Sequence, residues 1–64
     1  MKRITATFIG TDGSMGYRYW ASYKLLIDIS HNGNTRIRCI DGSQICEYSN
    51  ILTFLDNWSN IISE

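Results

Sequence analysis

The chain has 64 residues, of which 44% are hydrophobic and 12% aromatic, with six basic and six acidic side chains. A single domain of this size buries only about 60% of the surface that its unfolded chain exposes, so its core is small and self-association would stabilise it. The apolar content excludes an intrinsically disordered chain. No segment reaches the roughly 18 apolar residues of a membrane span, and the N-terminus lacks the apolar stretch of a signal peptide, which predicts a cytoplasmic protein.

The charge is distributed unevenly along the chain. Residues 1–38 contain all six basic side chains and two acidic ones, whereas residues 39–64 contain four acidic side chains and no basic ones, so the two parts carry +4 and −4. The simplest interpretation is that a basic sheet and an acidic tail attract each other. The alternative is a basic face that meets an anionic partner.

Alternating hydrophobicity predicts strands over most of the chain. Ile4, Ala6 and Phe8 alternate with threonines, as in a strand that has one buried face. A glycine-rich turn segment follows at 10–16. The other expected strands are 22–29, 35–40 and 45–48.

Two hairpin loops give an expected register for these strands. A three-residue first loop sets Asp28 opposite Arg38, which pairs an acid with a base. A four-residue second loop sets Cys39 opposite Cys46. Because the chain has no export signal, we expect the two cysteines to be neighbouring but reduced thiols.

The C-terminal segment has the hydrophobic period of a helix. The hydrophobic positions of this period are Ile51, Leu52, Phe54, Leu55, Trp58, Ile61 and Ile62. They predict a helix over about 49–62 with Ser49 as its N-cap. The sequence therefore predicts one α+β domain over 1–64, with strands in 1–48. Its expected fold is a small SH3-like antiparallel β-sheet, or a partly open barrel, of four to five strands closed by one C-terminal amphipathic helix.

Few residues are suited to catalysis. His31 is the only histidine and lies beside a hairpin loop, where a solvated turn residue is expected, and Ser14 has no base near it in the sequence. The six residues between Cys39 and Cys46 do not match a zinc site. We therefore expect a protein that is not an enzyme and that has no catalytic residue, metal site or cofactor.

The best candidate binding surface follows the glycine-rich segment. Its four residues are Tyr17, Arg18, Tyr19 and Trp20. Aromatic side chains beside an arginine can stack on bases or anchor a protein interface. The alternative is that at least one of Tyr19, Trp20 and Tyr23 fills the core.

Three basic residues of the expected sheet complete the candidate binding set. They are Lys24, Arg36 and Arg38. The expected register places both arginines on one face with Asp28 and Glu47, so pairing with these acids is the alternative to contact with a ligand.

Three motifs spread over the chain form a pattern. They are Phe-Ile-Gly-Thr-Asp-Gly-Ser-Met-Gly at 8–16, Tyr-Lys-Leu-Leu-Ile at 23–27, and Cys-Glu-Tyr-Ser at 46–49 with Phe54 and Trp58 beyond it. In these motifs the chain resembles a group of very short proteins encoded by phages and prophages of Gram-positive bacteria. The resemblance implies a phage accessory gene, and it implies no particular mechanism.

Size, candidate surface and resemblance together favour a non-enzymatic phage accessory protein. It is expected to act in the host cytoplasm by blocking a host protein, such as a component of bacterial immunity. One alternative is a nucleotide-binding module, either a sponge for a cyclic signalling nucleotide or a nucleic-acid binder. Another is a virion structural or assembly protein. The sequence predicts no membrane partner and leaves a homo-oligomer open.

Overall fold

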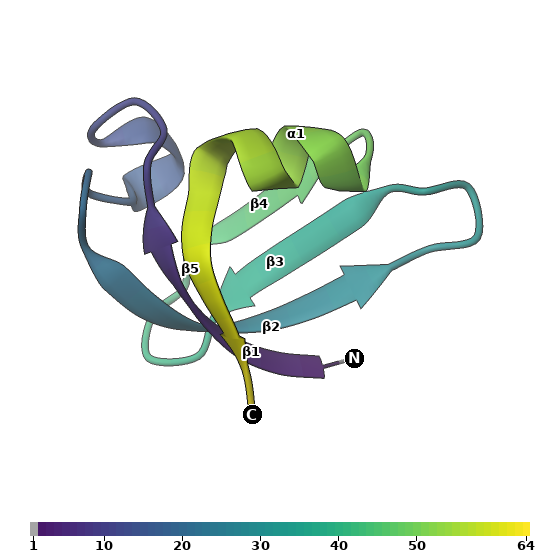
Figure 1. The fold of residues 1–64 in the computed structure, drawn as a ribbon, viewed down its shortest axis with the longest axis horizontal. Coiled ribbons are helices and arrows are strands. Elements are labelled where there is room, and N and C mark those ends of the chain that lie inside the picture. The colour runs from purple at the N-terminus through teal and green to yellow at the C-terminus, as the bar shows by residue number, and fades with distance from the viewer. Residues whose placement is uncertain (1) are drawn as a thin grey trace.

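The computed structural model describes residues 2–64 as one strongly curved antiparallel sheet with one short helix (Figure 1). The elements in chain order are β1 (Lys2–Phe8), the 3-10 turn η1 (Ser14–Gly16), β2 (Ser22–Ile29), β3 (Thr35–Cys39), β4 (Ile45–Tyr48), α1 (Ile51–Asn57) and β5 (Trp58–Ser63). The strand order in the sheet is β4-β3-β2-β1-β5. The sheet is open, and β4 and β5 are its edges. These elements confirm the predicted small α+β fold of four to five antiparallel strands with one helix.

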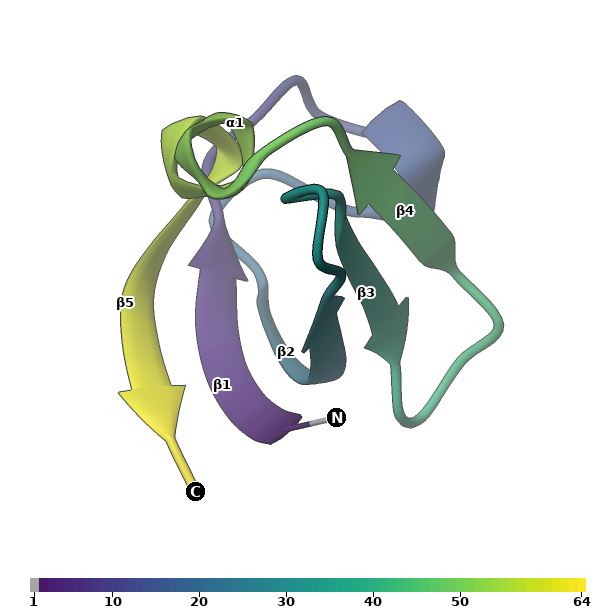
Figure 2. The same cartoon turned by 90° about the vertical axis from the view of Figure 1, so that its right-hand side faces the viewer.

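The sheet curls around its concave face, and α1 connects its two edge strands (Figure 2). Residues of α1 contact both β4 and β5. The helix therefore covers one end of the curled sheet, where an open sheet would otherwise expose its apolar inner face to water.

The prediction that the helix continues to about residue 62 is wrong. The helix ends at Asn57, and Trp58–Ser63 is strand β5, which pairs with β1. The pairing contains one extra residue on β5, and Asn60 there has a φ of 52°. Such a bulge places Trp58 and Ile61 on the same face of a strand although they are three residues apart. Hydrophobic residues with this spacing in a sequence are also typical of a helix. Pairing satisfies the backbone groups along the edge of β1 that a helix would leave free.

The start of the helix also differs by one residue from the expectation. Asn50, rather than Ser49, is the N-cap, and its side-chain Oδ1 accepts a hydrogen bond of 2.9 Å from the backbone N–H of Thr53. Asparagine and serine are about equally good at this position, so the sequence alone does not choose between them.

Both predicted hairpin registers are displaced by two residues. Asp28 lies opposite Arg36 rather than Arg38, and Cys46 lies opposite Ile37 rather than Cys39. Each loop has the expected number of residues but begins one residue earlier, because the backbone N–H of Ser30 bonds to the carbonyl of Asn34 and that of Cys39 to the carbonyl of Gln44. A displacement of two residues keeps every side chain on its predicted face, since the strand period is two. Both cysteines are buried and free.

The core is a cluster of aromatic and aliphatic side chains on the concave face. Its buried members are Ile4, Ala6, Phe8, Tyr17, Leu25, Ile37, Cys39, Cys46, Phe54 and Trp58. The Trp58 ring lies 4.9 Å from the Tyr17 ring and 5.0 Å from the Phe8 ring between centroids, edge to face in both cases. Its indole N–H donates a hydrogen bond of 3.1 Å to the hydroxyl of Tyr48. Trp58 therefore connects β1, β4 and the segment before β2 through one side chain.

Candidate functional site

Tyr17 is a core residue, which corrects its predicted place in the binding surface. Its side chain is fully buried, with its ring centroid 5.0 Å from that of Tyr23. Its hydroxyl donates a hydrogen bond of 3.2 Å to the carbonyl of Gln44. Burial raises the pKa of Tyr17 well above its ordinary value of 10.0. Tyr17 thus anchors the segment between β1 and β2 onto the core.

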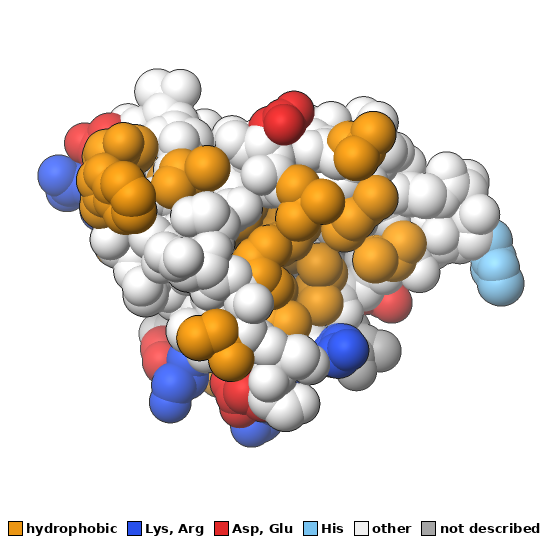
Figure 3. All heavy atoms as spheres, in the orientation of Figure 1, with side chains coloured by type: hydrophobic (Ala, Val, Ile, Leu, Met, Phe, Trp, Pro, Cys, Tyr) orange, Lys and Arg blue, Asp and Glu red, His pale blue; other side chains and the backbone are white. Residues whose placement is uncertain are grey.

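The neighbours of Tyr17 in the sequence lie on the surface. We call residues 9–21, which join β1 to β2, the aromatic loop. Tyr19 is 49% exposed and Trp20 is 61% exposed, and their rings meet edge to face at 5.5 Å between centroids. Met15 in the same loop is 54% exposed. Figure 3 shows hydrophobic side chains standing out beside a basic and an acidic side chain at the end of the molecule where this loop lies.

Asp12 holds the exposed part of the aromatic loop in place. Its Oδ1 atom accepts a hydrogen bond of 2.9 Å from the backbone N–H of Tyr19 and one of 3.0 Å from Nε of Arg18. The backbone N–H of Trp20 bonds to the carbonyl of Phe8 at 2.8 Å. The Tyr19 and Trp20 side chains are therefore presented to solvent from a backbone that is fixed at several points.

Two non-glycine residues of the aromatic loop have left-handed backbone conformations. Met15 has a φ of 55° and Trp20 has a φ of 66°. For residues with large side chains this conformation costs about 1 to 3 kcal/mol each, and such strain is concentrated at binding and catalytic sites. Trp20 is therefore a large, exposed side chain on a strained backbone, and it contributes little to the stability of the fold.

Two hydrogen bonds hold the pKa of Asp12 below its ordinary value of 3.8. The larger effect comes from the Tyr19 backbone N–H and the smaller one from the Arg18 side chain. A lowered pKa in the folded state means that the Asp12 contacts stabilise the loop above pH 3.8 and are lost as the pH falls through the lower folded value. We expect an NMR titration to give the Asp12 carboxyl group a midpoint below 3.8, with the Tyr19 amide following the same curve. In Asp12→Ala the Tyr19 amide should lose this dependence. A wild-type midpoint at or above 3.8 would show that the loop is not held in this way.

The remaining candidates, Lys24, Arg36 and Arg38, share the outer face of the sheet, away from the core. Leu25 and Ile37, which alternate with them, are fully buried on the inner face. Arg36 lies 4.0 Å from Glu47 between Nε and Oε2, and both side chains are well exposed. The expected pairing with acids therefore applies to Arg36. Arg38 takes part in no ion pair within residues 2–64.

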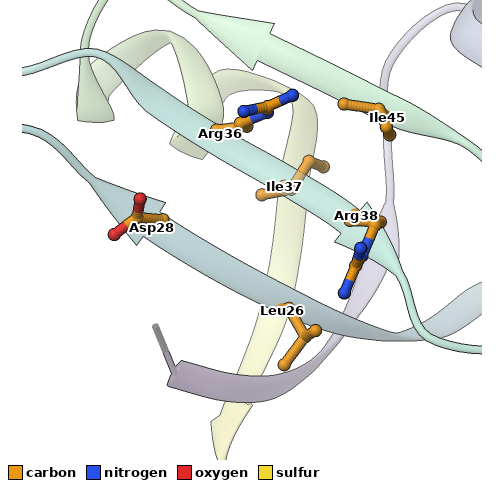
Figure 4. A pocket seen from close by; sticks show the side chains of 6 residues that line it. All are labelled: Leu26, Asp28, Arg36, Ile37, Arg38 and Ile45. Carbon is orange, nitrogen blue, oxygen red and sulfur yellow. The ribbon is translucent and has the colours of Figure 1, made fainter.

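A hollow on this outer face contains two residues that the sequence interpretation missed. Leu26 and Ile45 line it together with Arg38 (Figure 4). A signal for Leu26 was present, because the consecutive Leu25 and Leu26 break the strand alternation and one of them must face outward. No comparable signal marked Ile45.

A second group of exposed hydrophobic side chains surrounds α1 and β5. Its members are Ile51, Leu52 and Leu55 on α1 and Ile61 and Ile62 on β5. Figure 3 shows hydrophobic side chains gathered below α1, in a depression that continues toward the core. The expected homo-oligomer stays a prediction.

The part of the chain that the structure describes contains no candidate metal site. Within residues 2–64, no three or more His, Cys, Asp or Glu side chains lie close enough to hold a metal ion. Over the same residues, no helix has the length and hydrophobicity of a membrane span. His31 is exposed in the loop between β2 and β3, as expected for a turn residue.

Comparisons with protein-family models, with curated proteins and with solved structures found no match.

Proposed function

We propose that the protein is a non-enzymatic binding protein that docks on a partner protein through the aromatic loop and blocks it. The observation that carries this proposal is the exposed pair of Tyr19 and Trp20, held by Asp12 and beside Arg18. Tryptophan, tyrosine and arginine are the residues that most often dominate the binding energy of protein interfaces.

The fixed backbone of the aromatic loop supports the same proposal. A partner that binds a preformed surface does not have to order it, so less of the interaction energy is lost on binding. The strain at Trp20 points in the same direction, because glycine would adopt this backbone conformation more easily. The loop therefore presents a large side chain at a position that is unfavourable for folding alone.

The resemblance to short phage and prophage proteins supports a host factor as the partner. A component of bacterial immunity in the host cytoplasm is the partner class that we propose. A protein of 64 residues can act by covering a functional surface of a larger protein, which requires no catalytic group.

Replacing Trp20 by glycine is expected to abolish partner binding and leave the fold intact. Glycine suits the φ of 66°, so the free energy of unfolding should stay within about 1 kcal/mol of the wild-type value. Loss of an interface tryptophan should weaken binding by about thirtyfold or more, the equivalent of about 2 kcal/mol. The measurement is quantitative binding of the partner captured from a lysate of a Gram-positive host.

Leu52→Ala is the matched control, because Leu52 is 69% exposed and lies on α1, outside the aromatic loop. The proposal predicts that this variant binds the same partner with wild-type affinity. A folded Trp20→Gly variant that binds as tightly as the wild type would refute the proposal. Loss of binding in Leu52→Ala alone would assign the interface to α1 and β5.

A further inference from the structure

Basic side chains surround one apolar residue on the outer face of the sheet. In the sheet register Arg3 of β1 lies directly opposite Leu26 of β2, and Arg38 of β3 lies opposite Leu26 on its other side. Lys24 precedes Leu26 by two residues on the same strand and faces the same way. Neighbouring strands are about 4.8 Å apart and alternate residues about 6.6 Å apart, so three cationic side chains begin within about 7 Å of Leu26.

These three cations have no acidic partner within residues 2–64. The two ion pairs there join Arg18 to Asp12 and Arg36 to Glu47. The outer face around Leu26 therefore has an excess of positive charge, although the whole chain has a formal net charge of zero. A local excess of this kind attracts anions in spite of overall neutrality.

The same place on the sheet is hollowed. Two cavities of about 160 and 450 Å³ adjoin there and share Leu26, Arg38 and Ile45 as lining residues. Figure 4 shows Arg38 on β3 between Leu26 on β2 and Ile45 on β4, with Asp28 farther along β2. Both hollows are open to solvent, and the smaller one leaves room for a planar ring to lie against Leu26 and Ile45.

The lining of the smaller cavity combines three kinds of contact. Leu26 and Ile45 supply an apolar surface, Arg36 and Arg38 supply planar guanidinium groups, and Asp28 supplies a carboxylate. Guanidinium groups stack on bases and bind phosphates. A carboxylate accepts hydrogen bonds from the N–H groups of a base.

We propose that this outer face is a nucleotide-binding site, separate from the aromatic loop. The base lies in the smaller cavity against Leu26 and Ile45, and Asp28 accepts a hydrogen bond from it. The phosphate group meets Arg38 and the neighbouring Arg3 and Lys24. This site goes beyond the proposed protein-binding function and does not depend on it.

The test is an NMR titration of the ¹⁵N-labelled protein with each of the four nucleoside 5′-monophosphates. At least one of them should produce saturable shifts of the amide signals near Leu26 and Arg38. The matching nucleoside without phosphate, and inorganic phosphate without the base, should each bind at least about tenfold more weakly. Affinity for the monophosphate should fall as salt is raised.

Arg38→Gln should weaken binding of the monophosphate by about tenfold or more, whereas the control Arg18→Gln, which removes another exposed arginine, in the aromatic loop, should leave it unchanged. Trp20→Gly should also leave it unchanged, which separates this site from the proposed protein-binding surface. A tetranucleotide that binds more than about tenfold tighter than the monophosphate would assign the site to single-stranded nucleic acid. Equal affinities would assign it to free nucleotides.

Three results would overturn the proposal. The first is the absence of saturable shifts with every monophosphate and with the tetranucleotide at millimolar concentrations. The second is unchanged binding in a folded Arg38→Gln variant. The third is equal affinity for inorganic phosphate and the monophosphates, which would show that the cavity does not recognise a base.

Discussion

Replacing Trp58 by alanine is expected to unfold the domain. Trp58 is 1% exposed, and its ring packs against those of Phe8, Tyr17 and Phe54. Truncating a buried tryptophan to alanine costs about 3 to 5 kcal/mol. The core of a domain below about 70 residues rarely supplies more than about 3 to 5 kcal/mol of net stability, so little or none would remain.

Near-UV circular dichroism and thermal melting measure this effect. The Trp58→Ala protein should lack the near-UV signal of packed aromatic side chains and show no cooperative transition. Trp20→Gly is the control, since it removes the other tryptophan of the chain from an exposed position. An unchanged melting midpoint in Trp58→Ala would mean that α1 and β5 do not close the core as described.

Tyr17→Ala is expected to destabilise the protein by about 3 to 5 kcal/mol, because the ring is fully buried among aromatic neighbours. Tyr17→Phe should cost only about 0.5 to 1.5 kcal/mol, through loss of the hydrogen bond to the carbonyl of Gln44. Arg18→Ala is the control in the adjacent position, and it should change stability by about 0.5 kcal/mol or less. Urea unfolding of the three variants compares these values. Equal stability of Tyr17→Ala and Arg18→Ala would contradict the buried position of Tyr17.

The dependence of stability on pH above pH 10 gives an independent measurement of the burial of Tyr17. Burial raises the pKa of Tyr17 above 10.0 and that of Tyr48 to about 12. A raised pKa in the folded state contributes stability that is complete below pH 10 and is lost as the pH rises through the folded value. The melting midpoint of the wild type should therefore fall above pH 10, and Tyr17→Phe should fall less steeply.

The strands could be predicted from the sequence because one face of each is buried. The expected second and fourth strands coincide with β2 and β4, and the third differs by one residue at its end. Register could not be fixed to the residue, since a displacement of two keeps the same side chains on each face. The position of each loop along the chain decides the register, because a loop of the same length that begins one residue earlier displaces the pairing by two.

The segment after α1 shows where hydrophobic spacing fails as a guide. Trp58 and Ile61 have the spacing of a helix, yet the left-handed Asn60 between them inserts a bulge that brings both to one face of a strand. The available edge of β1 decides between helix and strand. That edge is a property of the assembled sheet rather than of residues 58–63.

The candidate site could be located only in part from the sequence. A loop has no alternation, so the pattern of Tyr17, Tyr19 and Trp20 does not reveal which ring turns inward. The contacts of Asp12 and the left-handed conformation of Trp20 decide it, by turning Tyr19 and Trp20 outward. On the outer face, the cross-strand position of Arg3 beside Leu26 depends on the pairing of β1 with β2.

Acrylamide quenching of tryptophan fluorescence tests most directly whether a partner covers the aromatic loop. The chain has two tryptophans, of which Trp20 is 61% exposed and Trp58 is 1% exposed. The free protein should therefore show one accessible and one protected fluorophore. On saturation with its protein partner, after subtraction of the partner's own emission, the accessible class should disappear. An accessible class that is quenched equally in the free protein and in the saturated complex would show that the partner binds elsewhere.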